Sequence, residues 1–263
     1  MNQEERLDYL INYLINENKE YGEELSSSYT NKKDLLRALF NVRDPKEASE
    51  EFIKIQDEYL KEEIRSKGIT CLSDIEEIDK DIYLWKGDIT TLECDAIVNA
   101  ANNYLQGCFQ PNHNCIDNAI HTFSGIQLRN ECAELMRAQG HLEETGKAKI
   151  TPAYNLPSKY VIHTVGPIVY LRLTKKEKEL LKSCYSQCLK VAENNGLNSI
   201  AFCCISTGVF GYPQEEAAKV AIDTVKEYKE INKSDIKVIF NVFKEEDERI
   251  YRWLLNGYKR IKD

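Results

Sequence analysis

Cys108, His113 and Cys115 stand within eight positions of one another, in the stretch 107–118. Thiolate and imidazole are ligands that zinc prefers. The stretch also contains Pro111 and three asparagines, so we expect a loop rather than regular structure. The pattern Cys-x4-His-x-Cys lacks the two well-spaced pairs of a zinc finger or ribbon, and three neighbouring ligands suit a catalytic zinc with an open position. On spacing alone, a zinc site and a loop that merely carries two cysteines and a surface histidine both remain open.

A second stretch contains two glycines between a predicted strand and a helix that begins near Pro213. Gly208 and Gly211 permit close approach of the backbone. Amide groups exposed at such a turn favour phosphate oxygens, although an ordinary glycine turn is an equally open interpretation. The stretch is neither the dinucleotide fingerprint nor a Walker loop, because no Lys-Ser/Thr pair follows the second glycine.

Asp88 follows another predicted strand, in the motif Gly87-Asp-Ile-Thr90. A carboxylate at the end of a strand can accept a hydrogen bond from an amino group, such as the exocyclic amine of adenine. Taken alone the signal is weak, because an aspartate in this position more often forms a turn or caps a helix.

Short apolar runs alternate with helical stretches from residue 82 onward. This alternation predicts a mixed, mostly parallel sheet with helices on its faces. Helices are expected over 116–137, from the cap at Thr174 to Asn195, from Pro213 onward and around 250–254. The predicted strands are Ile82–Trp85, Ala96–Val98, Ala148–Ile150, Tyr160–Val165, Ser199–Phe202 and Ile236–Phe240.

Residues 1–80 are expected to form an N-terminal helical extension, and residues 81–263 the α/β domain. Leu7, Leu10, Ile11 and Leu14 have the spacing of one helix face. Similar stripes begin at Leu35 and Phe52, and we expect Pro45 in the first turn of the third helix. Helices this short are marginal alone, so they should pack on the main body.

The charge of the chain is uneven. Residues 1–82 contain 21 of the 43 acidic and 12 of the 35 basic residues, so this part has a net charge of −9. The whole chain has a net charge of −8. Neither part has the basic surface expected of a protein that binds duplex nucleic acid. No run approaches the ~20 apolar residues of a membrane helix, and the acidic start does not resemble a signal peptide. Nine cysteines in such a chain indicate a reducing, cytoplasmic location.

Six motifs occur in the order typical of a macrodomain. Over residues 82–258 the chain resembles that family, which implies a three-layer α/β/α fold that binds ADP-ribose. By this resemblance Asp88 contacts adenine with Ile89 beside it, and Asn102 lies near the distal ribose. The loop from Ser206 to Phe210 would cradle the diphosphate. The expected ADP-ribose contacts are Asp88, Ile89, Asn102, Asn118, Ser206, Thr207, Gly208, Val209 and Phe210. The motifs are Gly87–Thr90, Ile97–Asn102, Ile116–His121, Gly146–Ala148, Tyr160–Pro167 and Ile205–Pro213.

The stretch 107–118 departs from the glycine run of MacroD-like hydrolases and resembles the zinc-containing macrodomains. That resemblance implies one Zn²⁺ per chain, held by Cys108, His113 and Cys115 beside the distal ribose. It also implies the N-terminal helical extension. Asp117 aligns with the catalytic aspartate of the MacroD-like group, and Asn102 is the second expected catalytic residue.

The chain is therefore expected to be a zinc-dependent hydrolase that removes mono-ADP-ribose from acidic side chains of proteins. Two alternatives share the same pocket: a non-catalytic ADP-ribose reader with a structural zinc, and an O-acetyl-ADP-ribose deacetylase. As a family, zinc-containing macrodomains are associated in bacteria with a sirtuin-type ADP-ribosyltransferase and a lipoyl-carrier protein, which suggests a modified carrier as substrate. Neither duplex nucleic acid nor a membrane is an expected partner.

Overall fold

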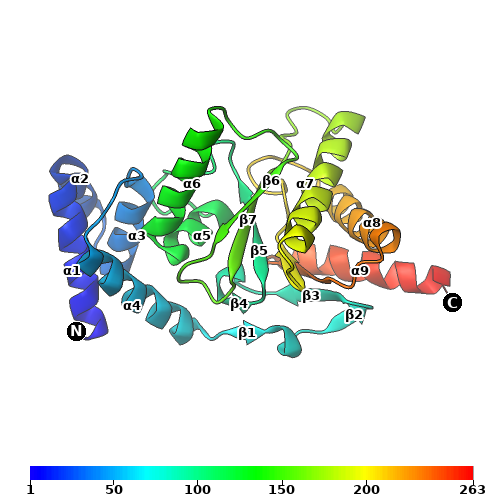
Figure 1. Ribbon diagram of the computed structural model, residues 1–263, viewed down its shortest axis with the longest axis horizontal. Coiled ribbons are helices and arrows are strands. Elements are labelled where there is room, and N and C mark those ends of the chain that lie inside the picture. The colour runs from blue at the N-terminus through cyan, green and yellow to red at the C-terminus, as the bar shows by residue number, and fades with distance from the viewer. Residues whose placement is uncertain (263) are drawn as a thin grey trace.

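A seven-stranded sheet forms the centre of the α/β body (Figure 1). The computed structural model describes residues 1–262, with side chains described as far as residue 257. The inner strands are parallel and the two edge strands are antiparallel, which confirms the predicted mixed, mostly parallel sheet. In spatial order the strands are β2 (Glu77–Asp79), β3 (Ile82–Lys86), β9 (Lys237–Val242), β8 (Ser199–Phe202), β5 (Ala96–Ala101), β7 (Tyr160–Val165) and β6 (Ala148–Pro152).

Helices cover both faces of this sheet. In the chain, α5 (Ile116–Ser124) and α6 (Ile126–Gln139) come after β5 and before β6. In space, α5 contacts β5 and α6 contacts β6. The helices α7 (Lys175–Asn194), α8 (Gln214–Asn232) and α9 (Glu245–Lys262) pack against one another in chain order. The chain crosses from β7 to β8 in the opposite direction to its crossing from β5 to β7. Right-handed crossovers therefore place the two groups of helices on opposite faces, and the predicted three-layer α/β/α fold is confirmed.

The predicted ends of two body helices are confirmed. Thr174 caps α7 in a capping box with Glu177, and Asn195 ends that helix. Pro213 is the residue before α8. Both signals are local in the sequence, so they need no knowledge of the tertiary structure.

The stretch 116–137, predicted as one helix, is two helices separated at Gly125. Gly125 has φ +95°, a conformation that residues with a side chain rarely adopt. A Cβ atom there would lie 2.7 Å from Gln56 Nε2. The Gln56 side chain instead accepts a hydrogen bond from the Ile126 amide at 3.0 Å, which satisfies the first turn of α6. The prediction failed because it ignored the glycine inside an otherwise helical pattern.

Four helices form the N-terminal part, with an apolar core of their own. The predicted face Leu7, Leu10, Ile11 and Leu14 is buried. Ile126 from α6 belongs to this core, so the N-terminal helices pack on the α/β body as expected. The helices are α1 (Gln3–Glu17), α2 (Lys19–Ser28), α3 (Lys32–Val42) and α4 (Glu50–Lys67).

Two details of the N-terminal prediction are wrong. Pro45 is not in a helix, because α4 begins only at Glu50, where the Ser49 hydroxyl accepts from the Phe52 amide at 3.2 Å. The last α-helix of this part also ends at Lys67, and only a short 3-10 helix, Leu72–Asp74, follows before residue 80. Residues 70–79 contain β1 (Thr70–Cys71) and β2, which pair with β4 (Leu92–Glu93) and β3. Their pairing partners come later in the chain, so the local sequence did not reveal them.

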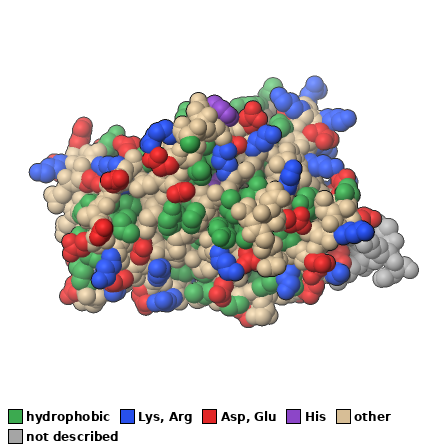
Figure 2. All heavy atoms as spheres, in the orientation of Figure 1, with side chains coloured by type: hydrophobic (Ala, Val, Ile, Leu, Met, Phe, Trp, Pro, Cys, Tyr) green, Lys and Arg blue, Asp and Glu red, His purple; other side chains and the backbone are tan. Residues whose placement is uncertain are grey.

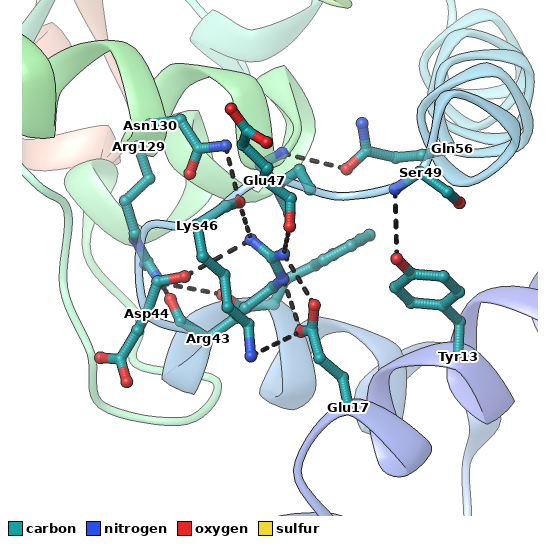
Figure 3. A network of polar contacts seen from close by, with 12 residues as sticks. Tyr13, Glu17, Arg43, Asp44, Lys46, Glu47, Ser49, Gln56, Arg129 and Asn130 are labelled. Carbon is teal, nitrogen blue, oxygen red and sulfur yellow. Dashed lines mark hydrogen bonds and ion pairs between the residues drawn. The ribbon is translucent and has the colours of Figure 1, made fainter.

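The connection between α3 and α4 is fixed from both sides (Figure 3). Arg43 forms two hydrogen bonds with the Glu17 carboxylate, at 2.8 and 2.9 Å, and donates to the carbonyl oxygens of Lys46 and Glu47. From α6, Arg129 donates to the carbonyl oxygen of Arg43 at 2.6 Å. The N-terminal part is therefore held to the body through a polar network as well as an apolar core.

Acidic and basic side chains are interspersed over the face seen in Figure 2, with apolar side chains between them. Among residues 1–262, none of the helices combines the length and apolar character needed to cross a membrane.

Candidate active site

A cavity of about 390 Å³ opens at the carboxyl ends of β5, β7, β8 and β9. Because α5 leaves β5 toward one face and α8 leaves β8 toward the other, a crevice forms between these strand ends. The cavity brings together the predicted metal ligands, both predicted catalytic residues and the whole predicted phosphate loop. Cys203 and Cys204 also line it. Its main lining residues are Asn102, Cys108, His113, Cys115, Asp117, Gly166, Cys203, Cys204, Ser206, Thr207, Gly208, Val209, Phe210, Asn241 and Phe243.

Cys108, His113 and Cys115 form a cluster with the geometry of a metal site. Their ligand atoms all lie within 4.8 Å of one another, and Cys108 Sγ is 3.6 Å from His113 Nδ1. Tetrahedral zinc, with bonds of about 2.3 Å to sulfur and about 2.0 Å to nitrogen, would hold such a pair about 3.6 Å apart. Burial raises the pKa of the Cys115 thiol to about 12. A bound cation would therefore be needed to hold this sulfur as a thiolate. The donor set and the spacing fit zinc.

Helix α3 of the N-terminal part holds the loop that carries these ligands. Arg37 Nη2 donates to the carbonyl oxygen of His113 at 3.3 Å and to Asn118 Oδ1 at 2.8 Å. Asn41 Oδ1 accepts from the Asn112 amide at 2.9 Å, and the Asn112 side chain donates to the carbonyl oxygen of Asp34 at 3.0 Å. Asn118, predicted to contact ADP-ribose, is thus fully buried between α3 and this loop and does not line the cavity.

Arg129 supports the same loop from α6. Its Nε donates to the carbonyl oxygen of Gln106 at 2.7 Å, and its guanidinium lies 4.2 Å from the centre of the Phe109 ring. Its Nη1 also donates to the carbonyl oxygens of Phe40 and Asn41, near the end of α3. Burial lowers the pKa of Arg129 to about 10, so the group stays charged at neutral pH. One buried cation therefore ties α3 to the loop that carries Cys108, His113 and Cys115.

Asp117 lies in the first turn of α5, with its carboxylate buried at the cavity wall. Its Oδ1 accepts from Asn99 Nδ2 at 2.8 Å and its Oδ2 from Asn102 Nδ2 at 3.2 Å. Burial raises the pKa of Asp117 to about 6, against the opposing effect of the Asn99 hydrogen bond. His121, one turn further along α5, lies with Nε2 3.6 Å from Oδ1, beyond hydrogen-bond distance. The two asparagines therefore orient the carboxylate.

The predicted phosphate loop 206–210 lines the opposite wall. Ser206 adopts φ +68°, and Tyr212 closes the turn by donating from its amide to the Ser206 carbonyl at 3.0 Å. Gly166, at the end of β7, approaches so closely that a Cβ there would meet Ser206 Oγ at 2.1 Å. The end of β7 and this turn thus form a narrow wall that includes backbone amides.

Asp88 and Ile89 are not part of the cavity lining. Ile89 is buried, and Asp88 Oδ2 lies 3.0 Å from Lys67 Nζ, at the end of α4. Thr90 donates to the other oxygen from its amide and its hydroxyl. Burial alone would raise the pKa of Asp88, but the hydrogen bonds from Thr90 and Lys67 lower it. The carboxylate is therefore ionised and already paired in this structure.

Several residues of the site were missed by sequence reasoning. Phe243 lines the cavity with 71% of its surface exposed, directly after β9. The register pairs Lys86 with Val242, so Phe243 lies at the same sheet edge as Gly87 and Asp88. Its position at a strand end was a usable signal, since the same reasoning identified Asp88. No comparable signal marked Arg37, whose contact with Asn118 spans 81 positions in the chain.

The fold and the site define an α/β protein with a ligand cavity at the strand ends and a cysteine–histidine cluster in its wall. Residues 98–221 match the macro domain family. A relative from Treponema medium, named protein-ADP-ribose hydrolase, is 53% identical over 97% of this chain and 100% of its own length. A relative of the same name from Staphylococcus aureus (strain MSSA476) is 48% identical over 95% of both chains. The Trypanosoma brucei macrodomain, solved in complex with ADP-ribose, superposes with a TM-score of 0.64 at 29% identity, covering 83% of this chain and 94% of its own. This chain belongs to the macro domain family.

Proposed function

We propose that this chain is a zinc-dependent hydrolase that removes mono-ADP-ribose from modified acidic side chains of proteins. The observation that carries the proposal is the cluster Cys108, His113 and Cys115 in the wall of the cavity that also contains Asp117. Relatives of about 50% identity named protein-ADP-ribose hydrolase support the reaction class. The zinc requirement rests on the ligand geometry and on the resemblance stated above.

The cavity offers separate surfaces for the parts of ADP-ribose. Amides of the loop 206–210 provide donors for the diphosphate, without the need for a cationic side chain. Phe243 presents an exposed ring on which adenine can stack. Asp88 is assigned to accept from the adenine amino group, which requires Lys67 to release or share Oδ2. This arrangement directs the distal ribose toward Asn102 and Asp117.

Hydrolysis consumes one water and breaks the bond between the anomeric carbon of the distal ribose and the carboxyl oxygen of the protein. The products are free ADP-ribose and the restored acidic side chain. Zinc held by the two thiolates and the imidazole would supply Lewis acidity and lower the pKa of a water toward about 7. Asp117 orients the attacking water or a ribose hydroxyl through its carboxylate oxygens. Asn99 and Asn102 hold those oxygens in place, so that no reorganisation is needed during the reaction.

We infer a reducing, cytoplasmic setting and a modified lipoyl-carrier protein as the first substrate to try. All nine cysteines are free in the structure, which supports a reducing environment. The carrier is suggested only by the family association.

The test measures ADP-ribose released from a protein modified on aspartate or glutamate. The wild type should release ADP-ribose, whereas Cys108→Ala and His113→Ala should release none at a detectable rate. Both variants should keep measurable ADP-ribose binding through the loop 206–210. Cys71→Ala is the matched control, because Cys71 lies outside the cavity and contacts Glu93.

Two results would replace the proposal with one of its alternatives. Tight ADP-ribose binding by zinc-loaded wild type, with no release from several modified proteins, would identify a reader. Release of acetate from O-acetyl-ADP-ribose much faster than release of protein-linked ADP-ribose would identify a deacetylase.

A further inference from the structure

A second hollow, of about 400 Å³, lies beside the loop that carries Cys108, His113 and Cys115. It is lined by Asn102, Tyr104, Gln106, Gly107, Cys108 and Phe109. Asn102 and Cys108 also line the first cavity, so these two residues form a ridge between the two spaces. The volume falls within the ~300–1,000 Å³ typical of ligand sites.

The walls of this hollow are fixed by hydrogen bonds. Asn102 Oδ1 accepts from the Tyr104 amide at 2.9 Å, and Asn102 Nδ2 donates to the carbonyl oxygen of Gly107 at 2.9 Å. Leu105 between them is fully buried and adopts φ +58°. Arg129 holds the far side by its bond to Gln106 and its position over the Phe109 ring. The hollow is therefore preformed.

Its lining is uncharged and combines two aromatic rings with the side chains of Asn102, Gln106 and Cys108. Tyr104 and Phe109 are 59% and 39% exposed, although aromatic rings of this size favour burial. The lining contains no Asp, Glu, Lys or Arg. Exposed aromatic side chains around a hollow are typical of surfaces that pack against a protein partner. A phosphorylated small molecule would find no cation there.

The reaction itself requires space on both sides of the bond that breaks. If the first cavity holds ADP-ribose with its distal ribose at Asn102, the modified side chain must leave that cavity across the neighbouring wall. The ridge of Asn102 and Cys108 is this wall, and the second hollow lies directly beyond it. An extended chain advances about 3.3–3.6 Å per residue, so residues next to the modified one would still lie close to the ridge.

We propose that this second hollow binds the polypeptide segment that flanks the ADP-ribosylated residue, with Tyr104 and Phe109 packing against its side chains. The inference rests on the proposed function, because it assigns the protein half of the same substrate. It also predicts a preference for modified sites with apolar neighbours.

The test compares the affinities of two ligands for the zinc-loaded full chain. One is free ADP-ribose, and the other is a peptide that carries ADP-ribose through a non-hydrolysable linkage. The wild type should bind the peptide more tightly. Tyr104→Ala should weaken peptide binding by about tenfold, the effect of losing one interface anchor, and leave binding of free ADP-ribose unchanged. Tyr21→Ala is the matched control, because Tyr21 lies on α2 and is 52% exposed.

Equal affinities of the wild type for both ligands would overturn the proposal. An unchanged affinity of Tyr104→Ala for the peptide would also overturn it, and so would an equal loss for both ligands. Phe109→Leu, with zinc content measured alongside, provides a second variant if Tyr104→Ala does not fold. These affinities are independent of turnover. A wild type that releases no ADP-ribose from any modified protein would refute the hydrolase proposal without deciding the assignment of the hollow.

Discussion

Among the residues whose side chains the structure describes, two clusters of cysteine and histidine have ligand atoms within 4.8 Å of one another. The first, Cys108, His113 and Cys115, is half-buried and lines the cavity. The second, His121, Cys132 and His163, is buried beneath it. The residue types are alike, and the difference lies in burial and in what the ring nitrogens and sulfurs already contact.

In the second cluster His163 and Cys132 have contacts within the core, whereas both ring nitrogens of His121 are buried without a hydrogen-bond partner. His163 Nε2 lies 3.0 Å from Thr151 Oγ1, and His163 Nδ1 lies 3.2 Å from Asn99 Nδ2. Burial lowers the pKa of His163 to about 3 and raises the pKa of the Cys132 thiol. These groups stay neutral, and a cation among them would face a large desolvation cost with a single thiol to neutralise it. Clustering of ligand types is thus insufficient for a metal site without an accessible cavity.

Asn99 connects the buried cluster to Asp117, which lines the same cavity as the first cluster. Its Nδ2 contacts both Asp117 Oδ1, at 2.8 Å, and His163 Nδ1. His163 of the buried cluster therefore helps Asn99 to position the carboxylate, while the accessible cluster is assigned to the metal. Four variants separate these roles, from the largest expected effect to the smallest.

Cys115→Ser should abolish zinc binding and reduce hydrolysis by more than about 100-fold, since a ligand matters more than its supporting contacts. Cys115 Sγ also accepts from the Asn118 amide at the start of α5. Serine is a good residue for such a cap, so the helix should remain intact. Zinc per chain, measured by elemental analysis, together with circular dichroism, checks this. One zinc per chain in Cys115→Ser would remove that cysteine from the metal site.

Asn99→Ala should reduce kcat by about 10–100-fold, the range typical of lost supporting contacts. The physical reason is that Asp117 loses the hydrogen bond that orients Oδ1. Zinc content and ADP-ribose affinity should be unchanged, because Asn99 lies outside the ligand cluster. Steady-state kinetics and calorimetry together distinguish this result from loss of the fold. A normal kcat would show that the buried cluster does not position Asp117.

Arg37→Ala should weaken zinc affinity by about tenfold, at the low end of the effect of lost supporting contacts. The variant loses the donors to Asn118 and to the carbonyl of His113, which fix the loop. Competition with a chromogenic chelator measures this affinity. Arg6→Ala is the matched control, since Arg6 of α1 forms an ion pair with Glu58 of α4, away from the loop. Equal zinc affinities of the two variants would contradict a role of α3 in holding the metal loop.

Cys132→Ala should leave zinc content and hydrolysis unchanged and lower the free energy of unfolding by about 1 kcal/mol, a typical cost of a small core substitution. Its thiol packs in the core and contacts His163 at 3.7 Å. Chemical denaturation with zinc analysis checks both parts. A fall in zinc stoichiometry would contradict the difference between the two clusters, because it would place a metal in the buried cluster.

The features that could be predicted from the sequence are those encoded by residues close together in the chain. Six strands of the central sheet, the capping box at Thr174 and the loop 206–210 are local patterns. Cys108, His113 and Cys115 were found together because they lie within eight positions. Asp117, two residues after Cys115, was identified by the resemblance to the MacroD-like group.

The contacts that assemble the site are distant in sequence and were missed for that reason. Arg37 reaches Asn118 across 81 positions, and Lys67 reaches Asp88 across 21. The parallel pairing of β1 with β4, which have β2 and β3 between them in the chain, likewise has no local pattern. Asn118, expected to contact ADP-ribose, instead accepts hydrogen bonds from Arg37, because α3 packs on that side of the loop.

The most direct test of the central claim is metal content and activity in one purified sample. Zinc per chain and ADP-ribose released from a modified protein would be measured before chelation, after chelation and after zinc is returned, with circular dichroism at each step. The account predicts one zinc per chain, loss of release on chelation and recovery with added zinc while the fold persists. Full release from folded, metal-free protein would contradict it.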